Sequence, residues 1–234
     1  IWSIQSISVE FDIRDLGLLS RSLLFSSTAA VLITAFGLFL AYIQRRNDDN
    51  FTKWMIRLST MGYALPGTVL AVGIVIMINS VDKSIIRVFN ELPGVKLSSV
   101  FNGTIFIVLF AYSVRFLTVG FNSTNSSMQR ITKNIDEAST LMGITGFKLL
   151  KRVHIPILKN GLFIAAMLVF VDVMKEMPIT LMTRPFGWDT LAVKIFELTS
   201  EGEWQRASLP SITLIFAGLI PLMFLNKKAD QSTF

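Results

Sequence analysis

Two long stretches of the chain contain no charged residue, and they limit the available folds more than any other feature. Residues 22–43 and residues 207–226 hold no Asp, Glu, Lys or Arg. An α-helix needs about 20 predominantly apolar residues to cross the hydrocarbon core of a bilayer. A backbone in lipid must also satisfy its own hydrogen bonds, which a helix does within one segment. These two stretches therefore predict membrane-spanning helices.

Three further apolar segments extend this pattern. Residues 58–81 are free of charge, residues 97–121 contain Arg115, and residues 155–171 contain one lysine. The whole chain is 52% hydrophobic and 16% charged, whereas soluble domains are about 25% charged. We therefore expect one all-α, polytopic membrane domain over residues 1–234, with about five transmembrane helices.

Polar connections separate the apolar segments. Residues 1–21 mix apolar and charged side chains and predict a peripheral entry segment. Residues 136–156 form a basic loop, and residues 177–206 form a long polar segment on the opposite side of the membrane. The side with residues 136–156 carries more Lys and Arg, so the positive-inside rule places this loop in the cytoplasm. The net charge of +6 is spread over short connections, which indicates loops beside a membrane and no nucleic-acid partner.

The types of residue present exclude several kinds of chemistry. The chain has no cysteine and one histidine, His154, which excludes disulfides, thiolate metal sites and histidine clusters. We therefore predict no resident metal site. A Walker-type phosphate loop is also missing, so we expect no bound cofactor and no ATP hydrolysis by this chain. The first residue is Ile1, and no signal-like region precedes the first apolar segment, so we expect a longer natural chain.

Residues 136–161 form a polar, basic insert between two apolar segments. Asp136 and Glu137 are acids suited to a helix N-terminus, and Gly143 permits a turn. Pro156 is tolerated in the first turn of a helix but not in its interior. The insert therefore predicts a short helix, a turn and a fresh helix start on one membrane face.

The spacing within this insert resembles the EAA signature of permease subunits in ABC importers. In that family the loop is a cytoplasmic coupling helix that docks into the ATPase subunit, and the fold is the all-α type I importer permease. Ser139, Val153 and Ile155 depart from the signature conservatively. The alternative is an ordinary amphipathic helix between two spans. The residues that the resemblance implies for coupling to the ATPase are Glu137, Ala138, Ser139, Gly143, Ile155 and Pro156.

A second resemblance concerns the transported solute. Residues 63–71 (YALPGTVLA), 175–178 (KEMP) and 184–192 (RPFGWDTLA) are similar to iron(III) importer permeases. Those proteins fuse two six-helix halves in one chain, and this sequence resembles the C-terminal half. The resemblance implies import of iron(III) from a periplasmic binding protein across the bacterial inner membrane. Related permeases for thiamine, polyamines, sulfate and phosphonates share this architecture and stay open as alternatives.

The same resemblance implies a set of partners. These are a dimer of ABC ATPase subunits that binds the ATP, a periplasmic solute-binding protein and a second permease half, fused or separate. The chain itself would be a multi-pass protein of the inner membrane, surrounded by lipid.

Four residues are candidates for the translocation path. Pro66 and Gly67 form a helix-breaking pair inside residues 58–81. Such a break is tolerated in lipid only where neighbouring helices or a cavity satisfy the freed backbone groups. Asp172 and Glu176, at the outer end of the fourth span, could present oxygen ligands or negative potential to a hard cation.

Structural explanations compete with these roles. Asp172 and Lys175 are three apart on a helix and could simply pair. Arg115 could snorkel to the cytoplasmic end of its span instead of lining a path.

Two other classes of membrane protein fit the sequence less well. A secondary transporter would show broken helices in matching halves with buried acids near mid-membrane, and only residues 58–81 are visibly broken. An intramembrane enzyme would need a nucleophile or paired acids at membrane depth, which the sequence does not offer.

Overall fold

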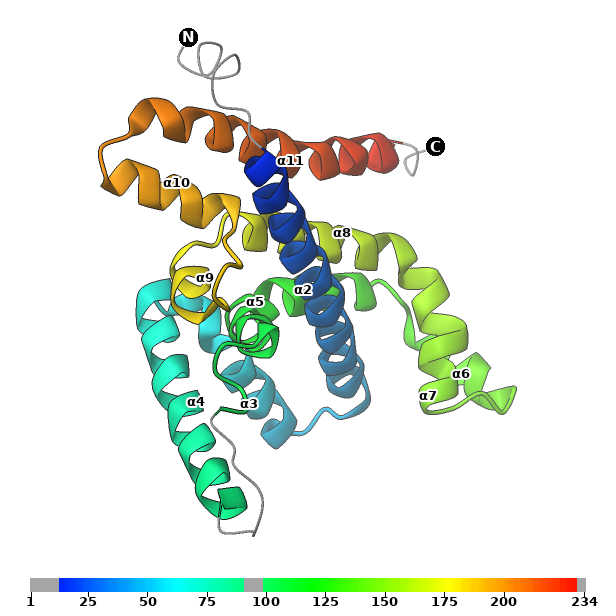
Figure 1. Ribbon diagram of the computed structural model, residues 1–234. Coiled ribbons are helices and arrows are strands. Elements are labelled where there is room, and N and C mark those ends of the chain that lie inside the picture. Colours follow the sequence, from blue (N-terminus) through cyan, green and yellow to red (C-terminus); the bar gives the residue numbers. More distant parts are fainter. Residues whose placement is uncertain (1–12, 91–98, 231–234) are drawn as a thin grey trace.

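The computed structural model describes residues 13–90 and 99–230, and every regular element in these ranges is a helix (Figure 1). Four of the described helical stretches are long and apolar enough to cross a membrane, and they overlap the first four expected spans. The second is displaced most, because its helix begins at Gly67 and runs to Asn90, whereas the expected span covered residues 58–81. The all-α, polytopic fold predicted from the sequence is therefore confirmed. The helices at the centre of these spans are α2 (Ile13–Arg46), α4 (Gly67–Asn90), α5 (Ile105–Met128) and α8 (Ile155–Met174).

Shorter elements connect the spans. They are α3 (Asn50–Ser59), the 3₁₀ turn η1 (Met61–Ala64), α6 (Lys133–Leu141), α7 (Phe147–Leu149), the π-helical turn η2 (Leu150–His154), α9 (Pro178–Thr183) and α10 (Leu191–Ser200), followed by the long C-terminal helix α11 (Trp204–Asp230).

The centre of the molecule is formed by α2, α5 and α8, which cross and pack against one another. Small residues allow the closest approach. A Cβ added at Gly37 on α2 would lie 2.8 Å from the carbonyl carbon of Gly120 on α5, and one added at Gly120 would lie 2.9 Å from Ile33 Cγ2. Close backbone approach at glycines is typical of helix packing in membranes, where apolar lipid provides no hydrophobic driving force.

The first helix is longer than expected. It begins at Ile13 and runs without interruption through Arg46, so residues 13–21 continue the first span and do not form a separate peripheral segment. The rest of that expected entry segment, residues 1–12, lies outside the described residues.

The start of the fourth span also differs from the prediction. Pro156 does not open a fresh helix, because the chain is helical from Phe147 through the π-helical turn into α8. A π-helical turn changes the hydrogen-bond register, so the missing N–H of Pro156 falls where the regular pattern is already interrupted.

The expected fifth span, residues 207–226, falls within α11, which packs against α10 and crosses the N-terminal part of α2 in Figure 1. Side chains at 220–222 and from 224 onward lie outside the described set. Within the polar segment 177–206, residues 191–200 form the short helix α10.

Candidate functional site

The helix α6 contains Glu137, Ala138 and Ser139, three of the six residues predicted to couple to the ATPase, and it ends in a turn that requires glycine. Gly143 has a φ of +76°, and its N–H donates to Thr140 O at 2.9 Å. The next N–H, from Ile144, reaches back to Ser139 O at 2.9 Å. This pair of bonds is a Schellman motif, in which the left-handed residue is usually glycine. The predicted turn at Gly143 is therefore confirmed.

The residues of α6 divide between two faces. Ser139 is buried, and its hydroxyl donates to Ile135 O at 2.7 Å. Glu137 and Ala138 are exposed, and the apolar side chains of Leu141 and Met142 are 90% and 77% exposed. One face of the helix therefore packs against the protein, and the other face, which is partly apolar, is exposed.

A polar cluster ties α6 to the rest of the molecule. Asp136 accepts from Arg45 Nε at 2.7 Å, and its other carboxylate oxygen lies 2.8 Å from His154 Nε2. Arg45 also donates to Met128 O at 3.1 Å and to Thr132 O at 3.2 Å. Burial acts to raise the pKa of Asp136, but the hydrogen bonds with Arg45 and His154 outweigh it and lower that pKa. The carboxylate therefore links α6 to the ends of α2 and α8.

The turn after α6 is held by the same neighbours. Tyr42 on α2 donates its hydroxyl to Gly146 O at 2.8 Å, and its ring packs edge-on against His154. Sequence analysis assigned no role to Tyr42, Arg45 or His154. Tyr42 and Arg45 on α2 contact residues more than 80 positions later in the chain. No local spacing in the sequence reveals such contacts.

The last two of the predicted coupling residues lie at the start of α8. Ile155 is half-buried against the core around Met128 and Leu158, whereas Pro156 is exposed. They follow His154 directly, so they stand beside the polar cluster but not on the exposed face of α6.

The predicted break in the second span is present and lies against α5. The 3₁₀ turn ends at Ala64, and α4 begins at Gly67. Arg115 Nη1 donates to the carbonyl of Leu65 at 3.2 Å, and the hydroxyl of Thr118 donates to the carbonyl of Thr60. Side chains of α5 therefore satisfy backbone groups that the break leaves free, as a span in lipid requires.

Glu176 lies beside the same break and pairs with Arg115. Its Oε2 lies 3.2 Å from Arg115 Nε, and its Oε1 accepts from Ile179 N at 3.2 Å. The side chains of Glu176 and Arg115 are only 7% and 20% exposed. A Cβ at Gly67 would lie 2.8 Å from Arg115 Nη1 and 3.3 Å from Glu176 Oε1. The break, α5 and the start of α9 thus meet at one buried ion pair.

This placement revises two expectations. Arg115 lies thirteen residues before Met128, or about 20 Å along an α-helix, so its side chain is engaged deep in α5 and does not snorkel to the α6 end. Glu176 is buried beside that arginine and does not stand on an outer surface. Asp172 is in a different position, because it pairs with Lys175 at 2.8 Å.

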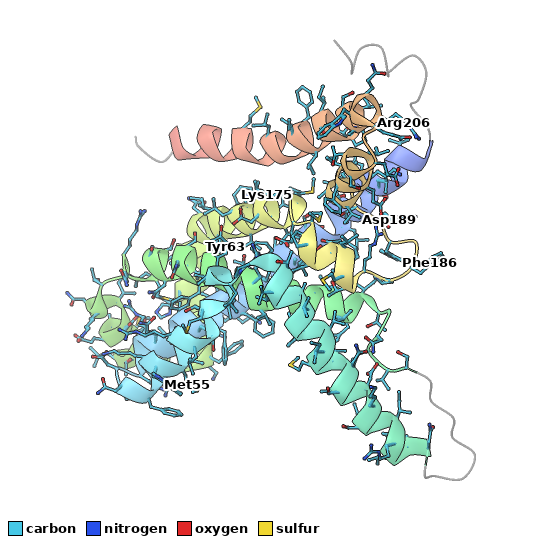
Figure 2. The ribbon with its side chains drawn as sticks, turned by 90° about the vertical axis from the view of Figure 1, so that its left-hand side faces the viewer. Met55, Tyr63, Lys175, Phe186, Asp189 and Arg206 are labelled. Carbon is cyan, nitrogen blue, oxygen red and sulfur yellow. The ribbon has the colours of Figure 1, made fainter. Side chains whose placement is uncertain are left out.

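Of the four candidate path residues, Pro66, Gly67 and Glu176 are brought together, and Asp172 stands apart in its own pair. Figure 2 shows Tyr63, in the break, close to Lys175 at the end of α8. Within the described residues, no three His, Cys, Asp or Glu side chains are grouped to hold a metal ion.

The segment between α9 and α10 carries an exposed aromatic side chain. Arg184 forms ion pairs with Asp189 and Glu197, and Gly187 has a φ of +75°. Between these anchors Phe186 is fully exposed and points away from the ribbon (Figure 2). The segment is therefore a fixed turn that presents one aromatic ring.

Sequence comparison relates the chain to transport permeases. No protein-family model matches it. It is 25% identical over 210 residues to the Fe(3+)-transport system permease protein FbpB 2 of Haemophilus influenzae, covering 90% of this chain but 38% of that protein. It is 27% identical over 213 residues to the putative 2-aminoethylphosphonate transport system permease protein PhnV of Salmonella typhimurium, covering 91% of this chain and 74% of that one. The chain thus spans about two fifths of the Haemophilus protein.

Comparison of folds gives the same class of protein. A chain of a bacterial ABC transporter involved in the import of alginate superimposes with a TM-score of 0.73 at 13% identity, covering 97% of this chain and 83% of that one. A chain of the MetNI methionine ABC transporter, in an inward-facing conformation, gives 0.58 at 14% identity, covering 93% and 99%. The fold is that of ABC transporter permease components, and with the four apolar helices it indicates a multi-pass protein of the bacterial inner membrane.

Proposed function

We propose that this chain, an ABC permease by sequence relationship and by fold, forms the transmembrane subunit, or half of one, of an ATP-driven importer. The observation that carries the proposal is the division of α6 into two faces. Asp136 and Ser139 hold one face on the protein, while Leu141 and Met142 leave an apolar surface uncovered at the other. Exposed apolar surface beside charged residues is typical of a docking site for another protein.

The docking partner in this proposal is a dimer of ATPase subunits in the cytoplasm. Arg45, Arg46, Lys53 and Arg57 accompany α6 at the same end of the bundle, which fits a cytoplasmic side by the positive-inside rule. ATP would be bound and hydrolysed by the partner, and this chain would contribute position and movement.

The polar cluster around Asp136 connects α6 to the spans that would move. Because Asp136 bonds to Arg45 on α2 and to His154 at the start of α8, a displacement of α6 acts directly on two of the spans. The second of these spans, α8, ends at Met174, and Glu176 two residues later pairs with Arg115 beside the break. A second permease half, fused or separate, would complete the path between the two halves.

The opposite end would meet a periplasmic solute-binding protein. The segment from residue 177 to residue 206 lies at the far end of α8 from α6 and includes the fixed turn with Phe186. An exposed aromatic ring on an ordered turn is suited to contact with a protein partner.

Iron(III) is the first candidate for the solute, because residues 63–71, 175–178 and 184–192 resemble iron(III) permeases and a Haemophilus relative carries that description. A phosphonate is the second candidate, since the Salmonella relative, described as a 2-aminoethylphosphonate permease, is matched over 74% of its length.

Uptake into vesicles tests the proposal. The full-length protein, its ATPase and its binding protein are reconstituted, and ⁵⁵Fe(III) or radiolabelled 2-aminoethylphosphonate is supplied outside with ATP inside. We expect accumulation of one solute that requires both ATP and the binding protein. Accumulation driven by a proton or sodium gradient without the ATPase would contradict the proposal in favour of a secondary transporter.

A further inference from the structure

Helix α4 stands at the edge of the bundle, and a buried acid lies in its second half (Figure 1). The main neighbours of α4 are α5 and α9. The side chains that α4 buries after its first residue form one stripe, which ends at the acid: Leu70, Ala71, Ile74, Ile78 and Asp82. Asp82 is only 2% exposed, within a helix long and apolar enough to cross a membrane. A carboxylate in such a place is costly to bury and needs polar partners.

Asp82 finds these partners in the turn that precedes α5. Its Oδ1 accepts from Phe101 N at 3.0 Å, and its Oδ2 accepts from Asn102 N at 3.1 Å and from Asn102 Nδ2 at 3.0 Å. The same Nδ2 also donates to Asn79 Oδ1 on α4 at 2.7 Å. Hydrogen bonds to an ionised acceptor are about twice as strong as those between neutral groups. These contacts among residues 79, 82, 101 and 102 are called the Asp82 clamp below.

The turn that carries the donors is itself well fixed. Thr104 N donates to Phe101 O at 3.1 Å, and Gly103 has a φ of +76°, a conformation that favours glycine. The ring of Phe101 packs against the central core. The Asp82 clamp therefore joins α4 to a firmly placed part of the molecule at the start of α5.

The first residue of α4 is held on α5 as well. Arg115 on α5 donates to Leu65 O at 3.2 Å and lies against the backbone of Gly67. Asp82 lies fifteen positions after Gly67, about 22 Å along an α-helix. Two widely separated polar contacts thus hold α4 on α5, with the apolar stripe packed between them. A helix held in this way cannot tilt about the break at Pro66 and Gly67 unless one of the contacts opens.

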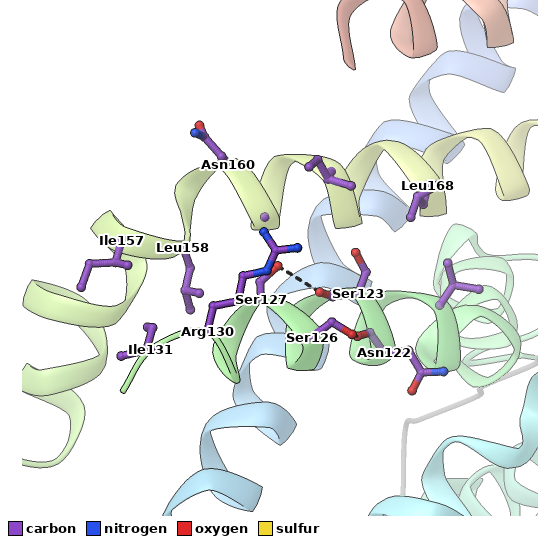
Figure 3. A pocket seen from close by; sticks show the side chains of 13 residues that line it. Asn122, Ser123, Ser126, Ser127, Arg130, Ile131, Ile157, Leu158, Asn160 and Leu168 are labelled. Carbon is purple, nitrogen blue, oxygen red and sulfur yellow. Dashed lines mark hydrogen bonds between the residues drawn. The ribbon is translucent and has the colours of Figure 1, made fainter. Parts of the chain in front are cut away.

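The other end of α5 packs on α8. A Cβ added at Gly161 on α8 would overlap the side chain of Ser127 on α5. Figure 3 shows this part of α5 running beside the first turns of α8, next to a groove between the two helices. The start of α8 is in turn bonded to α6 through His154 and Asp136. A movement of α6 therefore passes through α8 to α5 and, by way of the Asp82 clamp, to the far part of α4.

We propose that Asp82 is a positioning residue for transport, which makes α4 move together with α5. Its buried carboxylate is not available to a solute, and it acts through α4, whose first residue, Gly67, is a candidate path residue. The break before Gly67 is then a fixed bend and not a hinge. This role rests on the proposed function, because it concerns how the importer moves the helices of its path.

A disulfide across the Asp82 clamp tests whether the clamp opens during transport. The chain has no cysteine of its own, so Asn79→Cys with Asn102→Cys introduces one defined pair, and Asp82 keeps its backbone donors. The full-length double variant is reconstituted in vesicles with its ATPase and binding protein. We expect the disulfide to form equally without nucleotide and with ATP plus vanadate, and the oxidised protein to import solute at the rate of the reduced one. The two single-cysteine variants are the controls.

Two results of this experiment would overturn the proposal. Uptake that the disulfide abolishes and dithiothreitol restores would show that the Asp82 clamp opens in each cycle. A pair that forms no disulfide in either state would show that Asn79 and Asn102 are not adjacent.

Asp82→Asn tests the carboxylate itself. Hydrogen exchange of the backbone amides in residues 99–104 should become roughly 10- to 150-fold faster, the loss of hydrogen bonds to a charged group. The number of ATP molecules hydrolysed per solute imported should also rise, because α5 would move without α4. A role in folding alone would reduce the amount of active protein and leave this ratio unchanged. The matched control is Lys83→Gln, which removes an exposed charge at the next position of α4 and should change neither quantity.

Oxidation of the cysteine pair in the Asp82→Asn protein should restore the ratio, because the disulfide replaces the lost hydrogen bonds. An unchanged ratio in Asp82→Asn would overturn the proposal even if exchange became faster, since Asp82 would then be structural only. If Asp82→Asn did not accumulate in the membrane, the disulfide test in the protein that retains Asp82 would decide.

Failure of this proposal is separable from failure of the importer proposal. Absence of ATP-driven uptake by the unaltered protein would contradict the importer, and disulfide formation and hydrogen exchange would still measure the Asp82 clamp. ATP-driven uptake with an unchanged ratio in Asp82→Asn would leave the importer standing and remove the role of Asp82.

Discussion

Arg115 on α5 and Glu176 at the end of α8 form an ion pair, Nε to Oε2 at 3.2 Å, directly against the backbone of Gly67. The arginine also holds the carbonyl of Leu65, and the glutamate accepts from the first turn of α9. Three separate helices therefore depend on one pair of side chains at the break in the second span. If the spans move against one another during transport, this pair either moves as a unit or separates.

A double-mutant cycle measures how strongly the pair joins these helices. Arg115→Met and Glu176→Gln should each destabilise the protein by about 1–3 kcal/mol, because the remaining partner is left buried and unsatisfied. The double variant should lose less than the sum of the two, as expected for residues in direct contact. The measurement is thermal unfolding in detergent.

The pair of Asp172 and Lys175 is the matched control for that cycle. The Lys175 side chain is 64% exposed, so a coupling of about 0–1 kcal/mol is expected. If the two cycles gave equal coupling energies, the buried pair would have no special part in holding the break.

Gly67→Ala should disturb the same ion pair, because the pair packs against the backbone of Gly67. The added Cβ would lie 2.8 Å from Arg115 Nη1, and relief of such crowding typically costs about 1–3 kcal/mol. Gly73→Ala, on the same helix, is the control because nothing lies within 4 Å of its Cβ. We expect lowered uptake and a lower melting temperature for the first variant alone. Equal behaviour of both variants would show that the break tolerates a side chain.

Gly143→Asp should abolish ATPase stimulation by loaded binding protein while the spans stay inserted. A non-glycine residue at a φ of +76° is strained by roughly 1–2 kcal/mol, which would distort the turn that ends α6. Gly202→Asp introduces the same strain at a φ of +81° after α10 and should keep the stimulation. Wild-type stimulation in Gly143→Asp would remove the assignment of α6 as the coupling helix.

Glu137→Ala should be a milder version of the same defect. Glu137 is exposed on the free face of α6, where a desolvated contact with a basic group of the ATPase would contribute about 1–3 kcal/mol. Loss of that contact weakens docking roughly 5- to 150-fold in a pull-down of the ATPase subunit. Docking at wild-type affinity would place Glu137 outside the interface.

The lowered pKa of Asp136 predicts how the stability of the folded protein changes with pH. Its pKa is lowered in the folded state, so its contribution is complete above the unfolded pKa of about 3.9 and is lost as pH falls through the lower folded value. Asp136→Asn should therefore be less stable than the wild type at neutral pH, and the difference should shrink below about pH 4. Melting temperatures measured from pH 7 to pH 3 check this. A difference that is constant over this range would mean that the charge of Asp136 is not what holds α6.

Labelling of introduced cysteines tests the proposed sidedness. Thr140 on α6 and Ser200 at the end of α10 are both exposed, whereas Ser139 is buried and unsuited to the purpose. A cysteine at Thr140 should react only with reagent on the cytoplasmic side, and one at Ser200 only from outside. Reaction of both from one side would contradict the proposed topology.

The class of the protein and the positions at which its backbone breaks or turns follow from the order of the residues. Charge-free stretches of membrane length specify helical spans because no other open structure satisfies its backbone in lipid. The break at Pro66 and Gly67 and the left-handed turn at Gly143 were predictable as well, since proline and glycine act on their own backbone whatever surrounds them. These features are local, and local chemistry is visible in the order of the residues.

The contacts between distant side chains, in contrast, depend on how the helices pack in the folded protein. Arg115 and Glu176 are 61 positions apart, and their pairing depends on how α5 and α8 cross. Arg45 and His154 converge on Asp136 from two different helices, and neither residue has a neighbour in sequence that marks it. Long-range contacts are set by the packing of whole helices, so the partner of a side chain is fixed only when the bundle has formed. The same packing decides whether a charged residue lines a path or belongs to a structural pair.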